Sequence, residues 1–176
     1  SNLNNLGIDF KAKCFNNMVC AKKGLSPQII YFSTTDNILI TEFLSCSSLS
    51  PQVLQQSDFR RQLVHTLRKL HGGPRFRNEF DMSTLITRYC KIVTEKKIPL
   101  PIGSKKVLDH VNSIATALST FRDHLVPCHN DCIPENILSD GKKIYLVDFD
   151  YSGQNDPCFE LGNLCVENGF SDSQIR

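Results

Sequence analysis

The sequence of 176 residues contains no tryptophan, no Cys-x-x-Cys pair and no apolar run that approaches the length of about 18 residues needed to cross a bilayer. Its first residues lack the pattern of a signal peptide, so we expect no membrane span and a cytoplasmic location. The formal net charge is only +2, and the basic residues are scattered along the chain. A nucleic-acid partner is therefore not expected.

Eight cysteines are present, and their settings favour free thiols over disulfides or a metal site. Disulfides are rare in the reducing cytosol, where we expect this protein to reside. The closest group is Cys128 and Cys132, which flank His129. A zinc site there would need a second pair of ligands at a usual spacing, and the sequence has none. We therefore expect buried free thiols.

The chain has the length and the ordinary composition of one globular domain. Apolar residues predict a helix over residues 8–23, and Gly24 is placed to end it. Two strand-like runs follow at residues 28–32 and 38–44, and the turn between them predicts a hairpin. Residues 45–57 are rich in Ser, Gln and Cys and are expected to be a connector.

The pattern of apolar residues then becomes helical. Ser57 is a candidate cap for a helix with an apolar stripe that ends before Gly72, and more helices are expected further on. A second hairpin signal surrounds the turn at residues 139–142. The remaining predicted elements are helices over 81–95, 104–122 and 157–168 and strands over 137–138 and 144–147. This order predicts an α+β fold, with a small β-containing part at residues 1–44 and a mainly helical part at 45–176.

One constellation in the sequence carries recognisable chemistry. His129 is followed by Asp131 and then, after four residues, by Asn136, and a later apolar strand ends at Asp148. This spacing is that of a kinase catalytic loop, in which the Asp accepts the proton of the substrate hydroxyl. Mg²⁺ prefers carboxylate and carbonyl oxygens as ligands. We assign Asp131 as the catalytic base, Asn136 and Asp148 as catalytic Mg²⁺ ligands, and His129 as a structural brace.

Each of these residues also has an ordinary structural interpretation. Asp and Asn cap turns in all kinds of proteins, and a buried histidine is more often a structural residue than a proton shuttle. The combination of the spacing with the intervening hairpin favours the chemical interpretation for the carboxylates and the amide. It does not do so for His129.

The stretch from Val126 to Asn168 resembles the choline/ethanolamine kinase family, within the aminoglycoside-phosphotransferase-like small-molecule kinases. The resemblance is carried by His129 to Asn136, by Asp148 to Pro157 and by Phe159 to Asn163. It implies a protein-kinase-like fold of two lobes, with ATP and Mg²⁺ as cofactors. The implied reaction is phosphorylation of a small amino alcohol, most readily choline, with ethanolamine, thiamine or an aminoglycoside as alternative acceptors.

Further roles are implied by looser parts of the resemblance. Residues 1–44 correspond to a partial nucleotide-binding lobe and hinge, and residues 45–176 to the catalytic lobe. Asp150 and Tyr151 would face the substrate, although Asp150 could equally be a carboxylate at a hairpin end. The hinge backbone that meets adenine would be Thr41, Glu42, Phe43 and Leu44, although an ordinary edge strand would look the same.

The sequence departs from the family pattern in three respects. None of its nine glycines forms a loop that would cover the phosphates, and Lys13 stands where the family has an acidic residue. The family's cation pocket also uses aromatic residues beyond the equivalent of Asn168. Two interpretations stay open: part of a longer kinase that is truncated at both ends, or a degenerate, pseudokinase-like binding module without catalysis.

Overall fold

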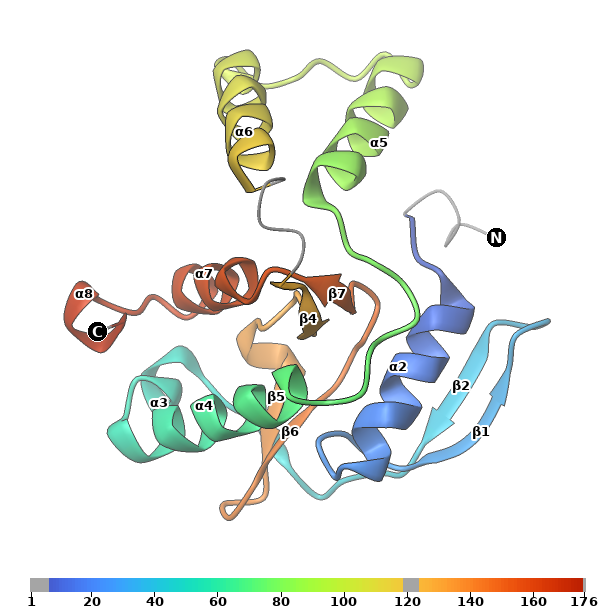
Figure 1. The fold of residues 1–176 in the computed structure, drawn as a ribbon, viewed down its shortest axis with the longest axis vertical. Coiled ribbons are helices and arrows are strands. Elements are labelled where there is room, and N and C mark those ends of the chain that lie inside the picture. The colour runs from blue at the N-terminus through green and yellow to red at the C-terminus, as the bar shows by residue number, and fades with distance from the viewer. Residues whose placement is uncertain (1–6, 119–123, 176) are drawn as a thin grey trace. The chain divides into compact units, whose positions relative to one another are not determined.

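The computed structural model describes residues 7–118 and 124–175 and divides the chain into two compact units (Figure 1). One unit consists of Ser1–Ile8 and Asp81–His124, and the other of Asp9–Phe80 and Leu125–Arg176. The division at residue 44 that the family resemblance implies stays a prediction. The described part of the chain contains no helix that is both long enough and apolar enough to span a membrane.

The described residues of the first unit form two helices, α5 (Met82–Glu95) and α6 (Ser104–Leu118), which contact each other. Asp81 caps α5, because its carboxylate accepts a hydrogen bond from the backbone N–H of Ser83 at 3.0 Å. Both helices were predicted and both are amphipathic, yet neither contains a buried residue. The end predicted for α6, at residue 122, lies outside the described residues.

The second unit begins with α2 (Phe10–Lys22), whose N-terminus is capped by the Asp9 carboxylate. It is followed by the antiparallel hairpin of β1 (Ile29–Ser33) and β2 (Ile38–Thr41), as the sequence predicts. The hairpin is continued by a hydrogen bond from the Glu42 N–H to the Gln28 carbonyl.

The expected connector at residues 45–57 has more structure than its composition indicated. It contains β3 (Ser47–Ser48), which pairs with a later strand, and the short helix α3 (Pro51–Leu54). Ser50 caps α3. The next helix, α4 (Ser57–His71), has Gln56 at its N-cap, so the expectation that Ser57 is the cap was wrong. A polar segment folds here because long-range pairing satisfies its backbone, which composition does not reveal.

The rest of the described part of this unit consists of two small sheets, one 3₁₀ helix and two α-helices. Two of the strands were not predicted, because strands of three residues are too short to show a period. These are β4 (Val126–Cys128) and β7 (Gly153–Asn155), which pair antiparallel. The predicted second hairpin is confirmed, and its strand β5 also pairs with β3. The remaining elements are the 3₁₀ helix η2 (Pro134–Asn136), β5 (Ile137–Ser139), β6 (Ile144–Leu146), α7 (Pro157–Glu167) and α8 (Asp172–Ile175).

The core of this unit lies where α4 and the β5–β6 hairpin meet, and the loop before β5 borders it (Figure 1). The β6 strand is also bonded to the segment after α2, through the Leu146 N–H and the Leu25 carbonyl. The buried members are Cys20, Leu25, Leu49, Leu54, Leu63, Leu67, Leu70, Phe76, Cys132, Ile137, Ile144, Leu146, Phe149 and Leu164. Residues just outside β5 and β6 are therefore held by a packed core.

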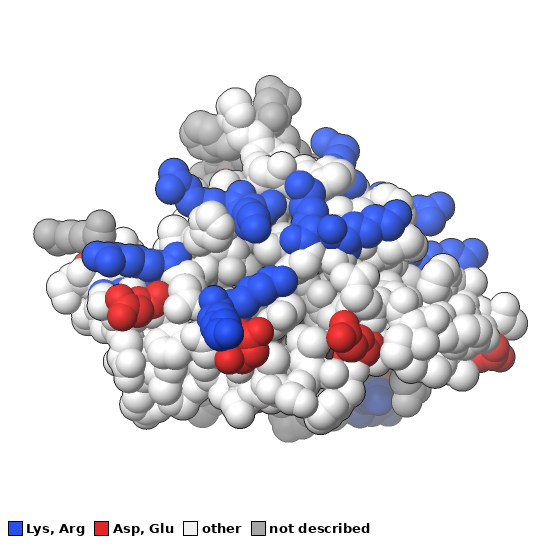
Figure 2. Space-filling view, turned by 90° about the horizontal axis from the view of Figure 1, so that it is seen from below, with Lys and Arg blue, Asp and Glu red and all other residues white. Residues whose placement is uncertain are grey.

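On the face that Figure 2 shows, side chains of both charges are visible, and Lys and Arg are more numerous than Asp and Glu. All eight cysteines are free, as expected, and four of them are fully buried: Cys14, Cys20, Cys128 and Cys132.

Candidate functional site

The β5–β6 hairpin brings the predicted metal ligands to one place. Its register pairs Ile137 with Leu146, so the residues just outside the pair, Asn136 and Val147, also face each other. The Val147 N–H donates to the Asn136 carbonyl at 3.1 Å, and Asp148 is the next residue. The hairpin is thus the reason why Asn136 and Asp148 lie together, although eleven residues separate them in the chain.

Asp131 is tied to the same place by a short loop. The side-chain amide of Asn136 donates to the Asp131 carboxylate at 2.9 Å and to the Asp131 backbone carbonyl at 3.0 Å. These two bonds close the loop from Asp131 to Asn136, which ends in η2 with Pro134 at the first helical position. The structure therefore brings together Asp131, Asn136 and Asp148, the three residues that the spacing singled out.

Two residues of the site have a left-handed backbone. Asn130 has a φ of 66° and Asp148 a φ of 62°. Asn tolerates this region well, and Asn130 is held there because its amide donates to the Tyr151 carbonyl and accepts from Asn155. Asp148 is about half exposed, so its carboxylate reaches solvent from a strained backbone. Strained residues that persist in a packed structure are concentrated at functional sites.

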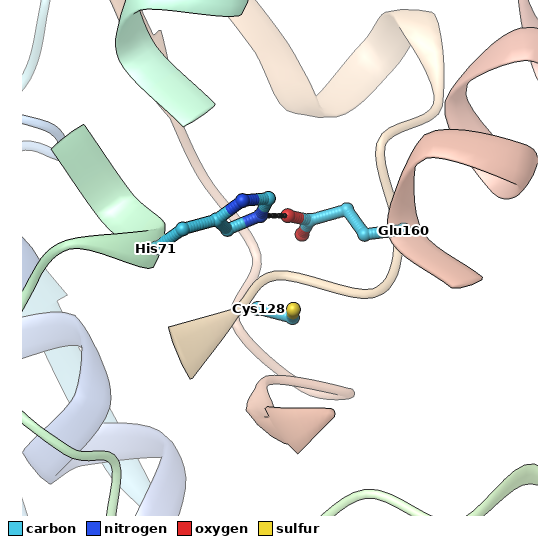
Figure 3. A group of neighbouring side chains, drawn as sticks. All are labelled: His71, Cys128 and Glu160. Atoms are coloured by element: carbon cyan, nitrogen blue, oxygen red, sulfur yellow. Dashed lines mark hydrogen bonds and ion pairs between the residues drawn. The ribbon is translucent and has the colours of Figure 1, made fainter. Parts of the chain in front are cut away.

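A buried carboxylate anchors the loop from the other side. Glu160, in the first turn of α7, is fully buried and accepts hydrogen bonds from the backbone N–H groups of His129 and Asn130, the second at 3.0 Å. Its other oxygen pairs with His71 Nε2 at the end of α4 (Figure 3). These contacts give Glu160 a structural role at the start of α7, and its partner His71 was not foreseen from the sequence.

Figure 3 also shows Cys128 beside this pair, and the three ligand atoms lie within 4.8 Å of one another. A metal centre is disfavoured here by the chemistry of the donors. Burial, with the Glu160 charge as a second cause, raises the pKa of the Cys128 thiol and keeps it protonated. The Glu160 oxygens already accept from backbone N–H groups and His71. The group is better described as an anchor of the loop.

His129 connects the loop to the hairpin. Its ring Nε2 is hydrogen-bonded to the Val147 carbonyl at 2.8 Å, and its ring meets Phe149 edge-on with centroids 4.7 Å apart. Both rings are completely buried. These contacts suit the structural brace expected from the sequence, because they fix the segment between the loop and Asp148.

The electrostatics of the site favour a basic carboxylate at Asp131. Burial raises the pKa of Asp131 above its ordinary value, and the neighbouring Asp148 charge adds to the rise. The charge of His129 and the hydrogen bond from Asn136 act in the opposite direction and lower the pKa of Asp131. A carboxylate with a raised pKa is a stronger base, which suits it to accept a proton.

The donor set fits Mg²⁺. The Asn136 amide nitrogen is committed to Asp131, so its carbonyl oxygen Oδ1 is the atom left to face a cation. The Asp148 carboxylate supplies a second hard oxygen. A carboxylate and an amide oxygen are ligands of the kind that this ion prefers.

The predicted substrate residues lie next to this group. Asp150 is paired with Lys13 of α2, whose ammonium also lies 3.6 Å from Asp148 Oδ1. Tyr151 meets Phe80 edge-on with ring centroids 6.3 Å apart, and Phe80 lies 5.4 Å from Phe159. Neither Lys13 nor Phe80 was assigned a site role from the sequence. The departure of Lys13 from the family pattern was the only available signal.

The hinge residues lie at the end of the first hairpin. Thr41 is the last residue of β2, and the chain then continues through Glu42 and Phe43, which are exposed, to Leu44, which is half-buried. Phe43 is 89% exposed. The binding of adenine by this segment stays a prediction.

Comparison with known proteins shows the family to which the chain belongs. Residues 7–175 match the sequence profile of the family described as Choline/ethanolamine kinase. The chain belongs to this family. Over 164 residues it is 26% identical to Protein LicA of Haemophilus influenzae (strain ATCC 51907 / DSM 11121 / KW20 / Rd), covering 91% of this chain and 61% of that protein.

Solved structures show the same fold. A choline/ethanolamine kinase family protein from Mesorhizobium loti is 29% identical, with a TM-score of 0.80 over 96% of this chain and 57% of its own. The choline kinase LicA of Streptococcus pneumoniae, at 23% identity, has a TM-score of 0.85 over 99% of this chain and 62% of its own. The predicted α+β, kinase-like fold is thus confirmed, and the chain spans about three fifths of these relatives.

Proposed function

We propose that this chain carries the phosphoryl-transfer site of an ATP- and Mg²⁺-dependent kinase that phosphorylates the hydroxyl group of a small amino alcohol, with choline as the preferred acceptor. The observation that carries the proposal is the convergence of Asp131, Asn136 and Asp148 on one loop and one hairpin. This is the arrangement that the transfer of a γ-phosphoryl group requires.

Asp131 acts on the acceptor hydroxyl. It accepts the proton while the hydroxyl oxygen forms a bond to the γ-phosphorus of ATP, and the bond from that phosphorus to the β–γ bridging oxygen breaks as ADP leaves. The raised pKa of Asp131 makes the carboxylate a stronger base. The bond from Asn136 holds the carboxylate in one orientation, so the loop supplies positioning as well as basicity.

Asn136 and Asp148 would hold Mg²⁺, which when bound neutralises the negative charge of the phosphates. The hairpin register and the left-handed backbone at Asp148 present these two side chains from neighbouring backbone positions. The use of a nucleotide also agrees with a solved LicA structure, which is in complex with AMP.

The preference for choline rests on the surroundings of Asp150. Aromatic faces favour a quaternary ammonium group, and a carboxylate adds charge complementarity. Next to Asp150 in the sequence is Tyr151, which stands edge-on to Phe80, and the Phe80 ring also packs against Phe159. All three rings are only half-buried, so part of each is left for a ligand. One relative is named choline kinase alpha, which agrees with this preference. Another is named ethanolamine kinase 1, so ethanolamine is the main alternative.

A second candidate function is a binding module without catalysis, and one specific observation favours it. Lys13 places a positive charge against Asp148 and Asp150, where catalysis would need a metal ion and a cationic acceptor. A protein of this kind would not release ADP with any acceptor.

The decisive measurement is Mg²⁺-dependent ADP release from ATP, with choline, ethanolamine, thiamine and an aminoglycoside compared against no acceptor. We expect choline to stimulate release most. Asp131→Asn should lower that rate by about 10²–10⁴-fold while ATP binding is kept, because only the proton acceptor is lost. Glu135→Gln, an exposed carboxylate of the same loop, is the matched control. Unchanged turnover in Asp131→Asn contradicts the mechanism, and ATP binding without release favours the binding module.

A further inference from the structure

Lys13 forms ion pairs with two carboxylates of the candidate site. Its ammonium Nζ contacts Asp150 Oδ1 directly and lies 3.6 Å from Asp148 Oδ1. The Lys13 side chain is 20% exposed and that of Asp150 24%, so this pair is largely shielded from water, whereas the Asp148 side chain is half exposed. A shielded pair keeps more of its Coulomb attraction than a pair on the surface.

The position of Lys13 is set by a buried network one turn further along α2. Asn16 lies three residues after Lys13, on the same face of the helix. It is fully buried and donates to Ser152 Oγ at 3.0 Å and to Asn78 Oδ1 at 2.9 Å. Ser152 follows Asp150 by two residues. The network therefore holds this face of α2 against the segment that carries Asp148 and Asp150.

An ammonium at this place competes with a divalent cation. Asp148 Oδ1 is one of the oxygens through which we propose that Mg²⁺ is held, and a second positive charge within about 4 Å of it opposes the binding of the ion. Resemblance to the family leads one to expect an acidic residue at this position of the helix, which would have no such effect. The reversal of charge at Lys13 thus acts on the metal site itself.

We propose that Lys13 is an internal counter-ion of the metal site, which pairs with Asp148 and Asp150 when no metal is bound and lowers the affinity of the site for divalent cations. The inference rests on the metal-binding role proposed above for Asp148. Helix α2 would thus influence how much metal the site binds, because the metal must compete with Lys13 for Asp148.

The test is a titration of the whole chain with Mn²⁺ alone, in which the decrease of the free-ion electron paramagnetic resonance signal measures binding. Lys13→Met should bind Mn²⁺ about tenfold more tightly than the unchanged protein, because the competing charge is gone. Lys13→Arg keeps the charge and should bind as the unchanged protein does. Lys11→Met, an exposed lysine of the same helix, is the matched control and should change nothing.

A second variant keeps the test decisive if Lys13→Met folds poorly. Lys13→Gln keeps a hydrogen-bond donor for Asp150 and should also bind Mn²⁺ more tightly. Without metal its melting temperature should fall, because Asp148 and Asp150 lose their counter-charge, and Mn²⁺ should restore it. Equal or weaker Mn²⁺ binding in both neutral variants overturns the role of Lys13 alone. Binding that is absent from all variants, or that persists in Asp148→Asn, overturns the proposed metal site and this inference with it.

Discussion

The two hairpins of the second unit are similar in sequence and opposite in environment. Both are short runs of β-branched and aromatic residues around a polar turn, and both were predicted on that ground. In β5–β6, Ile137, Ile144 and Leu146 are completely buried. In β1–β2, by contrast, Ile30 is 69% exposed and Ile40 is 47% exposed.

The difference between the hairpins comes from their partners. The β5–β6 hairpin contacts α4, pairs with β3 on one edge and is bonded to Leu25 through Leu146. The β1–β2 sheet has two strands in the described structure, and most of its apolar side chains are exposed there. The candidate site is attached to the buried hairpin. An apolar pattern therefore predicts a strand, while the packing around it decides whether the strand can hold catalytic groups in place.

The largest effect on stability is expected from removing the buried Glu160 carboxylate, which anchors the catalytic-loop segment at His129 and Asn130. Glu160→Ala leaves His71 and two buried backbone N–H groups without their acceptor, so unfolding free energy should fall by about 3–5 kcal/mol. Urea denaturation measures this. Glu167→Ala, an exposed glutamate of the same helix, should stay within about 0.5 kcal/mol. A loss in Glu160→Ala no larger than in this control would show that Glu160 is not an anchor.

Matched truncations in the two hairpins test the comparison directly. Leu146→Ala, in the buried hairpin, should lower the free energy of unfolding by about 2–5 kcal/mol, because it removes a fully buried side chain and leaves a cavity. Ile40→Ala, in the exposed hairpin, should cost less than about 1 kcal/mol. Denaturant unfolding of both variants gives the difference. Equal losses would mean that the first hairpin is covered in solution, for example by a partner.

The smallest effect is expected at the turn of the buried hairpin. Hydrogen bonds from the backbone N–H groups of Lys142 and Lys143, each 2.8 Å, hold the pKa of Asp140 below its ordinary value. A lowered pKa stabilises the fold above the unfolded-state pKa of about 3.9, and that contribution is lost as the pH falls through the folded-state pKa. Asp140→Asn should lack it.

Melting temperatures measured between neutral and acid pH test this sign. The difference between the unchanged protein and Asp140→Asn should be largest near neutral pH and should shrink below a pH of about 4. A difference that grows on acidification would contradict the assignment, because it would require a pKa of Asp140 that is raised on folding.

Much of the fold was predictable from local pattern. The helices α2, α4 and α5 and both hairpins lie within a few residues of where periodicity and turn residues placed them. The structure in residues 45–57 was missed because Ser47 and Ser48 form a strand only by pairing with Ser139 and Leu138, about ninety residues away. No local preference of those serines indicates this.

By itself the sequence determined how the polar groups of the loop are arranged. Asp131 and Asn136 are five residues apart, and a turn of the backbone suffices to bond them. Asp148 joins them because a hairpin with a short turn has only one register that buries Ile137, Ile144 and Leu146. These relations depend on neighbours along the chain, and therefore they can be read from spacing.

Only the tertiary structure decided what surrounds that loop. It paired His71 with Glu160, placed Lys13 against Asp148 and Asp150, and bonded Asn16 to Ser152 across 136 residues of sequence. Each of these contacts joins two segments whose meeting depends on how the whole core packs. Side chains that are far apart in the chain meet only when the elements between them have folded, and no local propensity specifies such a meeting.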